Sequence, residues 1–395
     1  MSSSTKVPRL SGFLASTLPK IAFLLGGLSL ALTAVLWRGN PHHTAFSYLF
    51  SFLFFLSITL GSLFFVIIQH LTRAGWSVVL RRIPETFAMN AWVMAVFFLP
   101  ILFGIHELYH WTHADVVAAD PILQGKAGYL NIKFFLVRAV LFLGAWVWMA
   151  RYFYKKSVKQ DSSGDPKLTL SMQAFSAAAI LIFAITLTFG IIDWAMSLTP
   201  HWYSTMFGVY FFAGSAVAAF AIMSLVALTL RRFGYLKDII RVEHYHDVAK
   251  FLYGLNIFWA YVSFSQYFLI WYANIPEESV WFMQHFNGSW NTVAATLAIG
   301  HFFVPFLIFM SKHTRRNLTA HCAMMVWFLV MHCLDIYWLI MPNITPNGIH
   351  ISVSDISSFV GIGGIYIGFF WLRLRNASLI PVQDPRLPES LRHHT

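Results

Sequence analysis

Long apolar stretches alternate with short polar gaps along this chain of 395 residues. Ten stretches are each near or above the roughly 20 residues that a helix needs to cross about 30 Å of hydrocarbon. The pattern therefore predicts an all-α integral membrane protein with ten transmembrane helices. The stretches are Ile21–Trp37, Tyr48–Leu71, Phe87–Ile105, Phe134–Phe153, Ala174–Ile192, Met206–Leu230, Phe251–Tyr272, Val293–Met310, Asn317–Met341 and Ile356–Leu372.

Basic residues are concentrated in every second gap. Most of the 27 lysines and arginines lie before the first stretch, as Lys6, Arg9 and Lys20 do, or after an even-numbered stretch. The other gaps hold only three basic residues and seven of the 16 acidic ones, namely Arg38, Lys126 and Lys133 with Glu107, Asp115, Asp120, Asp193, Glu277, Glu278 and Asp355. Because lysine and arginine are enriched in cytoplasmic loops, both termini are predicted to be cytoplasmic and the outer face acidic.

Composition agrees with a membrane protein, since 58% of the residues are hydrophobic and only 11% are charged. The net charge of +11 suits anionic phospholipid at the inner leaflet and indicates no nucleic-acid partner. Cys322 and Cys333 both lie in the ninth stretch and are interpreted as small hydrophobic residues. The sequence has no Cys-x-x-Cys-His motif and no cysteine cluster for iron and sulfur. The first stretch is interpreted as a retained helix rather than a signal peptide.

The chain is predicted to form a single integral membrane domain, because no loop is long enough to fold separately. Residues 1–44 would be a tail and the first helix, 45–192 a first four-helix bundle, 193–341 a second, and 342–395 the last helix and a cytoplasmic tail. Helices two to five and six to nine both begin with an inward crossing, so the bundles could be parallel repeats. The longest loops are predicted at His106–Ile132 outside and Arg151–Ser171 inside.

Polar side chains within the apolar stretches are the first candidates for chemistry, because each is costly in lipid unless it is paired or hydrated. Arg138 lies about 9 Å below the predicted outer surface at 1.5 Å per residue, with Glu107 or Asp193 as candidate partners. His332 and Asp335 are three residues apart on one helical face, so they form either a packing hydrogen bond or part of a proton path. Gln266 and His301 lie at similar depths, whereas the inner halves hold almost nothing ionisable beyond His321.

A run of histidines follows the third stretch. Spacings of three and four place His106, His110 and His113 near one helical face, beside Glu107 and Asp115, where they could bind a metal. A loop that packs against a partner protein is the preferred interpretation, because no further ligands converge in the sequence. Haem is not expected, since the histidines securely inside the membrane, His301, His321 and His332, offer too few pairs at equal depth.

Three segments resemble one family. ELYHWTHADVVAADPILQGKAGYLN (107–131) with FFLVRA (134–139), SLTPHWYSTMFGVYFFAGS (197–215) and FWAYVSFSQYFLIWYANIPEE (258–278) are similar to the F subunit of bacterial alternative complex III. This subunit belongs to the polysulfide-reductase-type (NrfD-like) membrane subunits. The resemblance covers essentially the whole chain.

The resemblance implies two four-helix bundles flanked by two peripheral helices, in the bacterial cytoplasmic (inner) membrane. It also implies a subunit without cofactors in a quinol:cytochrome c oxidoreductase, beside a homologous C subunit that receives quinol. An extracytoplasmic iron–sulfur subunit and multihaem cytochrome c subunits would carry the electrons. Polar residues of the F subunit are interpreted as a proton half-channel, and the candidates here are Glu107, His110, Asp115, Arg138, Asp193, Gln266, His301, His332 and Asp335.

Three function classes follow from these observations. The first is a scaffold subunit that also contributes a proton path in the outer half of the membrane. The second is a quinone-binding redox subunit in its own right, with a pair such as His110 and Glu107 lining an outward-facing cavity. The third is a secondary transporter, which is disfavoured because breaks at the midplane are scarce: Pro305 interrupts one helix, and Gly361, Gly363 and Gly364 lie in another.

Overall fold

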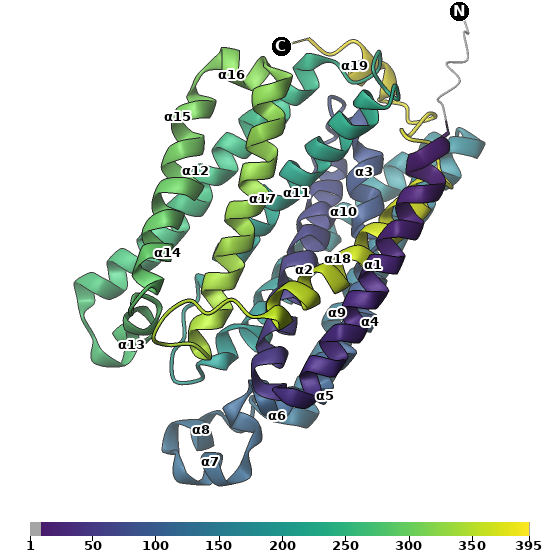
Figure 1. The fold of residues 1–395 in the computed structure, drawn as a ribbon. Helices are drawn as coiled ribbons and strands as arrows, with labels where there is room; N and C mark the ends of the chain where they lie inside the picture. Colours follow the sequence, from purple (N-terminus) through teal and green to yellow (C-terminus); the bar gives the residue numbers. More distant parts are fainter. Residues whose placement is uncertain (1–8, 395) are drawn as a thin grey trace, which may run out of the picture.

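The computed structural model describes residues 9–394, which form helices and no β-strand (Figure 1). Lys6, one of the basic residues before the first apolar stretch, lies outside the described residues. Both ends of the described chain lie at the same end of the molecule, at the top of Figure 1. We call this the terminal end. The opposite end carries the segment from α6 to α8, and we call it the protruding end.

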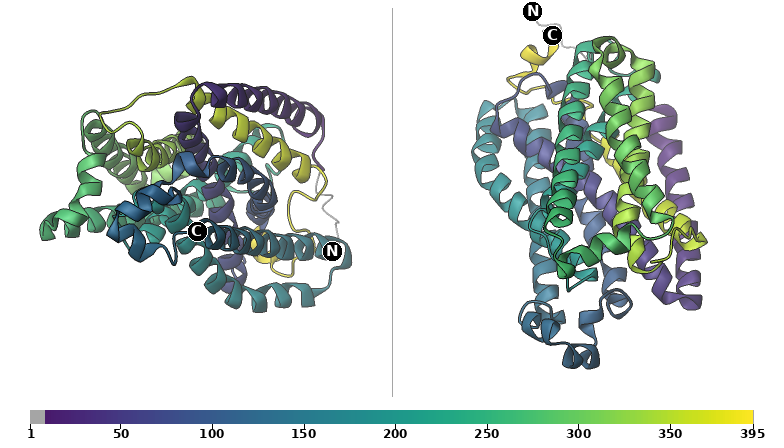
Figure 2. Two further views of the ribbon diagram at one scale, coloured as in Figure 1. Left: turned by 90° about the horizontal axis from the view of Figure 1, so that it is seen from below. Right: turned by 90° about the vertical axis from the view of Figure 1, so that its left-hand side faces the viewer.

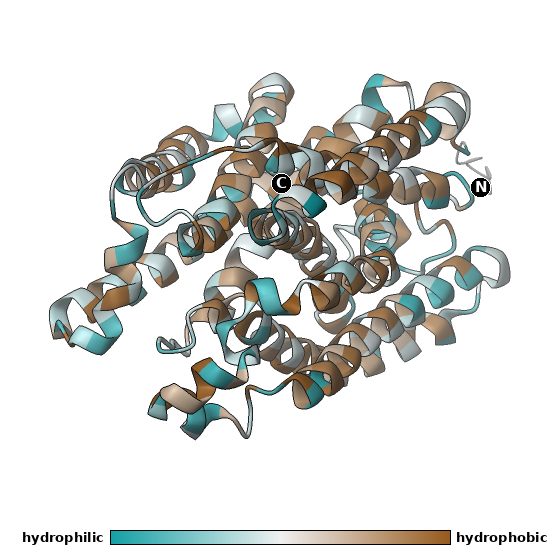
Figure 3. Ribbon diagram, turned by 60° about the horizontal axis from the view of Figure 1, so that its bottom comes forward, coloured by the Kyte–Doolittle hydropathy of each residue, from teal (hydrophilic) through white to brown (hydrophobic). Residues whose placement is uncertain are grey.

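Nine helical segments among residues 9–394 are long and apolar enough to cross a membrane, which indicates a multi-pass membrane protein. Apolar residues run through the middle of the long helices, and polar residues are more frequent at their ends and in the connections (Figure 3). The segments are Gly12–Gly39, Pro41–Leu71, Val78–Phe103, Ile132–Ser163, Pro166–Leu198, Phe207–Arg232, Trp290–Met310, Leu318–Asn343 and Val353–Leu374.

The seventh predicted span corresponds to α12, Val242–Ala273, a helix of 32 residues that does not meet the apolarity criterion. Asn256, Gln266 and several tyrosines and tryptophans lower its mean hydropathy, because all of these residues are less hydrophobic than aliphatic ones. It nevertheless runs alongside α11 (Phe207–Arg232) and α15 (Val304–Met310) (Figure 1).

The predicted inner loop Arg151–Ser171 is almost entirely helical, so that prediction was wrong. Helix α9 (Ile132–Ser163) and helix α10 (Pro166–Trp194) are separated by two residues. Gly164 adopts a left-handed conformation with φ of 61°, and the Asp165 side chain accepts a hydrogen bond from the Lys167 backbone at 2.9 Å. Helices α9 and α10 are therefore joined by a tight turn.

The helices of the third and eighth predicted spans are both interrupted, so helix breaks within the spans are more frequent than the sequence suggested. The third consists of α3 (Val78–Ala88), α4 (Ala91–Phe97) and α5 (Leu99–Phe103). The eighth consists of α14 (Trp290–Thr296), a π-helix (Leu297–Phe303) and α15. Pro305 follows the π-helix, where its missing N–H alters the usual helical hydrogen bonding.

The predicted outer loop contains short helices that project beyond the bundle (Figure 2). They are α6 (Ile105–Leu108), a 3-10 turn (His110–Thr112), α7 (Ala114–Ala119) and α8 (Pro121–Lys126). Helix α13 (Pro276–His285) lies at the same end. The short helices α16 (Lys312–Arg316) and α19 (Leu387–Leu391) lie at the terminal end.

Helix α2 (Pro41–Leu71) is the central helix, and most of its residues are buried. It packs closely on α11, because a Cβ atom at Gly61 would lie 2.0 Å from the carbonyl oxygen of Ser215. It also contacts α17 (Leu318–Ile340) and α18 (Val353–Leu374). Helix α1 (Gly12–Gly39) lies along α18 at the edge of the molecule, and a Cβ atom at Gly26 would lie 2.7 Å from the backbone nitrogen of Ile365.

Candidate functional site

The predicted site residues fall into three places. Arg138 and Asp193 meet between α9 and α10. Gln266, His301, His332 and Asp335 lie among α12, the π-helix and α17. Glu107, His110 and Asp115 lie apart from both groups in the projecting segment, where the side chains are exposed or half-buried.

Arg138 forms a two-pronged ion pair with Asp193. Its Nε atom donates to Oδ2 at 2.6 Å and its Nη2 atom donates to Oδ1 at 3.1 Å, while Nη1 donates to the Tyr129 carbonyl at 2.9 Å. The guanidinium also lies 3.8 Å from the ring centre of Tyr129. Of the two partners that depth suggested, Asp193 is the one used, and Glu107 lies 3.6 Å from His42 instead.

His106, His110 and His113 do not share one helical face, so the geometry on which the predicted metal site rested was wrong. Helix α6 ends at Leu108, and the chain turns through a 3-10 segment before α7 begins. The His106 Nδ1 atom lies 3.0 Å from the Thr112 hydroxyl, and His113 Nε2 lies 2.9 Å from the His106 carbonyl. These ring nitrogens therefore serve to hold the loop.

His301, His332 and Asp335 form the one group of potential metal ligands found among residues 9–394. One ligand atom from each lies within 4.8 Å of the others, and all three side chains are buried. They come from the π-helix and from α17, and α11 packs against them. We call these three residues the histidine–aspartate cluster.

Asp335 is held by two aromatic side chains that the sequence did not single out. The Tyr210 hydroxyl on α11 donates to its Oδ1 atom, and the Trp259 indole on α12 donates to Oδ2 at 3.2 Å. The Trp259 ring also stacks on His301, with ring centres 3.9 Å apart. These contacts fix both the carboxylate and the imidazole.

The two histidines are each oriented by one further partner. His301 Nδ1 lies 3.0 Å from the Asn256 side-chain oxygen, and His332 Nε2 lies 2.8 Å from the Ser57 hydroxyl. The other ring nitrogens, His301 Nε2 and His332 Nδ1, have no hydrogen-bond partner among the described residues. A buried imidazole nitrogen without a hydrogen-bond partner can bind a metal ion or accept a proton.

A small cavity lies on the protruding side of the cluster. Its volume is about 10 Å³, and Tyr210, Ser263 and Gln266 are its polar lining residues. This is close to the space that one water molecule needs. The Gln266 side-chain oxygen also accepts from the Ser204 hydroxyl at 3.2 Å, in the connection before α11, so polar groups continue from the cluster toward the protruding end.

Toward the terminal end, the cluster is followed by apolar side chains. Phe328 packs against His301 and against Phe309, which in turn stacks on His321. His321 Nε2 lies 2.7 Å from the Ser224 hydroxyl. The two phenylalanines therefore separate the cluster from the next polar group.

The terminal half is richer in polar groups than predicted, because α12 and α3 begin earlier than the apolar pattern showed. His244, His246 and Asp247 are buried in the first turns of α12. Arg81 and Arg82 are buried in α3 rather than exposed in a loop, and both pair with Glu85 at 3.0 Å. Their other partners, Asp384 and Asp161, come from the C-terminal segment and from α9.

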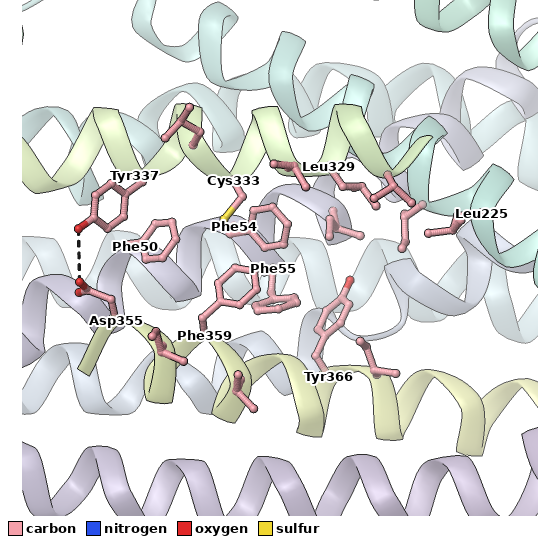
Figure 4. Close-up of a pocket in the computed structure, with 18 of the residues that line it drawn as sticks. Phe50, Phe54, Phe55, Leu225, Leu329, Cys333, Tyr337, Asp355, Phe359 and Tyr366 are labelled. Carbon is pink, nitrogen blue, oxygen red and sulfur yellow. Dashed lines mark hydrogen bonds between the residues drawn. The ribbon is translucent and has the colours of Figure 1, made fainter. Parts of the chain in front are cut away.

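An apolar groove of about 760 Å³ lies between α2, α17 and α18 (Figure 4). Aromatic rings line it, including those of Phe50, Phe54, Phe55 and Phe359. Tyr337 and Asp355 lie at one end, where the hydroxyl donates to the carboxylate at 3.3 Å. His43 Nε2 lies 3.4 Å from the same carboxylate. The groove thus combines a long apolar wall with one polar end.

No protein-family model matches the chain, and no curated protein matches it. The placement of its buried polar groups is therefore the main guide to its function.

Proposed function

We propose that this chain is a membrane subunit of a quinol-oxidising respiratory complex, alternative complex III, in the bacterial cytoplasmic membrane. It acts there as a scaffold beside the related C subunit and exchanges protons with the outer side through its second bundle. It carries no redox cofactor of its own. Iron–sulfur clusters and c-type haems belong to an extracytoplasmic iron–sulfur subunit and to multihaem cytochrome subunits.

The observation that carries this proposal is the histidine–aspartate cluster with its small cavity. A buried carboxylate beside two imidazoles can hold a proton. The cavity at Tyr210 and Gln266 has room for about one water molecule on the protruding side. Phe328 and Phe309 close the opposite side, so exchange is favoured with one face of the membrane only.

The proposal includes ten spans, with α12 as the seventh. Both ends of the described chain lie at the same end of the molecule, which supports an even number of crossings. Adding α12 to the nine apolar segments gives ten. The spans from α2 to α10 and from α11 to α17 then form the two four-helix bundles, and α1 and α18 form the peripheral pair. The basic residues of the terminal end favour a cytoplasmic location for both termini.

Asp335→Asn tests the proton role. Asparagine keeps the size of the side chain. Its amide oxygen can still accept from Trp259 while its NH2 group donates to the Tyr210 hydroxyl oxygen, so we expect normal assembly. Quinol oxidation should stay within a few-fold of the unaltered complex, while proton release in sealed vesicles should change. The matched control is Asp247→Asn, another buried carboxylate that lies at the terminal end and outside the cluster, which should leave proton release unaltered.

Two outcomes would count against this role. Failure of Asp335→Asn to assemble would make the cluster a packing element. Unchanged proton release in an assembled variant would remove Asp335 from the path. For the complex itself, the chain should leave mild detergent with multihaem cytochrome and iron–sulfur subunits, and a solitary protein with transport activity in liposomes would refute the assignment.

A second candidate function is quinone binding by this chain, and the aromatic groove favours it. His110 and Glu107 line neither this groove nor the small cavity beside the cluster, whereas Tyr337 and Asp355 lie at the polar end of the groove. A planar headgroup at that end and an isoprenoid tail along the phenylalanines would match its chemistry. Retention of quinone by the purified chain, and its loss in Phe54→Trp, would support this function.

A further inference from the structure

The two ring nitrogens of the cluster without a hydrogen-bond partner, His301 Nε2 and His332 Nδ1, both carry a lone pair and no hydrogen. Asn256 offers its oxygen to His301 Nδ1, so Nδ1 carries the hydrogen and Nε2 is bare. The Ser57 hydroxyl donates its only hydrogen to the Phe54 carbonyl at 2.7 Å, so it accepts from His332 Nε2 and leaves Nδ1 bare. Each imidazole therefore keeps one bare lone pair, and ligand atoms of both rings and of the carboxylate lie within 4.8 Å of one another.

The two lone pairs and the carboxylate oxygen repel one another in a low-dielectric interior unless a cation lies among them. A single proton can bridge only two of the three atoms, for example His332 and Asp335, and would leave the His301 nitrogen without a partner. A metal ion accepts an electron pair from all three. We propose that His301, His332 and Asp335 form a binding site for a divalent transition-metal ion of the zinc class.

The surroundings of the cluster match those of metal sites. Ligating histidines usually donate their other N–H to a neighbouring acceptor, as both do here through Asn256 and Ser57. The carboxylate is held by Tyr210 and Trp259. His301 also lies within a π-helix, a distortion that is frequent at functional sites because it redirects a side chain.

Gly214 on α11 provides space beside the ligand atoms. A Cβ atom there would lie 3.1 Å from His332 Nδ1 and 3.7 Å from an Asp335 oxygen. Trp259 covers His301 and Phe54 packs on His332, so there is little room for more than one additional ligand. Four-coordinate geometry with two imidazoles and a carboxylate is typical of zinc, whereas iron sites of this composition keep several open positions.

This inference goes beyond the proposed function and does not depend on quinol oxidation. A metal ion and a proton would compete for Asp335. Zinc binding can be measured without turnover, so failure to bind zinc would leave the proton role standing. Conversely, an unaltered proton release in Asp335→Asn would leave the metal site standing.

The test uses the purified protein in its native assembly, with any affinity tag removed, stripped with a chelator and then loaded with Zn²⁺ alone. We expect one tightly bound zinc ion in this chain, with nitrogen and oxygen ligands at about 2.0–2.1 Å in X-ray absorption spectra. His301→Asn and His332→Asn should each weaken binding at least about tenfold. Gly214→Ala keeps every ligand but fills the space beside them, and it should weaken binding as well.

His321→Asn is the matched control, because it removes another buried histidine of α17 that is hydrogen-bonded to a serine but lies outside the cluster. Zinc affinity should be unaltered in it and in His110→Ala on the surface. An equal loss in either control would overturn the site, as would zinc bound through sulfur, unaltered binding in the ligand variants, or no retained zinc. If the histidine variants fail to fold, the spectrum of the unaltered protein and Gly214→Ala still decide the question.

Discussion

At the scale of single residues, depth in the membrane is the most informative quantity. Counting residues from the predicted surface left Glu107 and Asp193 as candidate partners of Arg138, and the structure pairs it with Asp193. The same count placed His332, Asp335 and His301 at similar levels, and they meet. Tyr210 and Trp259 could not be found in this way, because aromatic residues make up 17% of the chain and no single one stands out.

Arg138→Leu should reduce the amount of folded and assembled protein. It leaves Asp193, which is fully buried, without its partner, and breaking a buried ion pair costs about 3–5 kcal/mol. Thermal unfolding in detergent and the yield of intact complex measure this loss.

The control for that change is the double variant Arg138→Leu with Asp193→Leu. It removes both charges together, so it should recover much of the lost stability. A fully assembled Arg138→Leu protein with quinol oxidation reduced about tenfold, equivalent to about 1.4 kcal/mol of barrier, would instead give Arg138 a functional role.

At the scale of elements, the apolar pattern located the middle of each helix but not its ends. Helix α9 has 32 residues, or about 48 Å at 1.5 Å per residue, so it extends well beyond the hydrocarbon into a polar environment. Hydropathy detects only the part in contact with lipid. The burial of Arg81 could not be predicted for a different reason. Its partner Asp384 lies 303 positions away in sequence, and hydropathy gives no information on such distant pairs.

The C-terminal segment is clamped by that ion pair, and the clamp should depend on pH. Burial alone would raise the pKa of Asp384, but the Arg81 guanidinium 2.5 Å away outweighs it and holds the pKa below its ordinary value of 3.8. The stabilisation is therefore complete above about pH 4 and is lost as the pH falls through the lower, folded-state pKa. Hydrogen exchange of residues 380–392 should increase only in that acidic range.

Asp384→Asn should release the segment at neutral pH, because Arg81 then keeps only Glu85 as a charged partner. Trypsin cleavage after Arg386 should become at least several-fold faster. The exposed Glu389 forms no ion pair in the described part of the chain, so Glu389→Gln is the matched control and should leave cleavage unaltered. Equal rates in both variants would show that Asp384 does not hold the segment.

At the scale of the whole molecule, the sequence predicted an all-helical membrane protein, and the structure confirms that class. The arrangement of the helices was less accessible. The central position of α2 follows from close approaches such as that of Gly61 to Ser215, which depend on residues far apart in sequence. A single sequence carries no signal for such pairs, because glycine and serine are common throughout it.

Ten spans require α12 to cross the membrane, and this can be measured directly. Asp238→Cys precedes α12 and Glu277→Cys follows it, and both positions are exposed. A membrane-impermeant maleimide added to intact cells should label Glu277→Cys and reach Asp238→Cys only after lysis. Labelling of both from one side would reduce the number of crossings to nine and place the two chain ends on opposite faces.

The pairing of α1 with α18 has a consequence for biosynthesis. The close contact between Gly26 and Gly364 joins two helices that are translated at very different times, since the sequence between α1 and α18 includes all the other long helices. Helix α1 must therefore wait in the bilayer for a time on the order of tens of seconds, while the residues between it and α18 are translated. During that interval the face of α1 that carries Gly26 is open to other proteins, so an insertion chaperone or a neighbouring subunit can bind it before α18 is inserted.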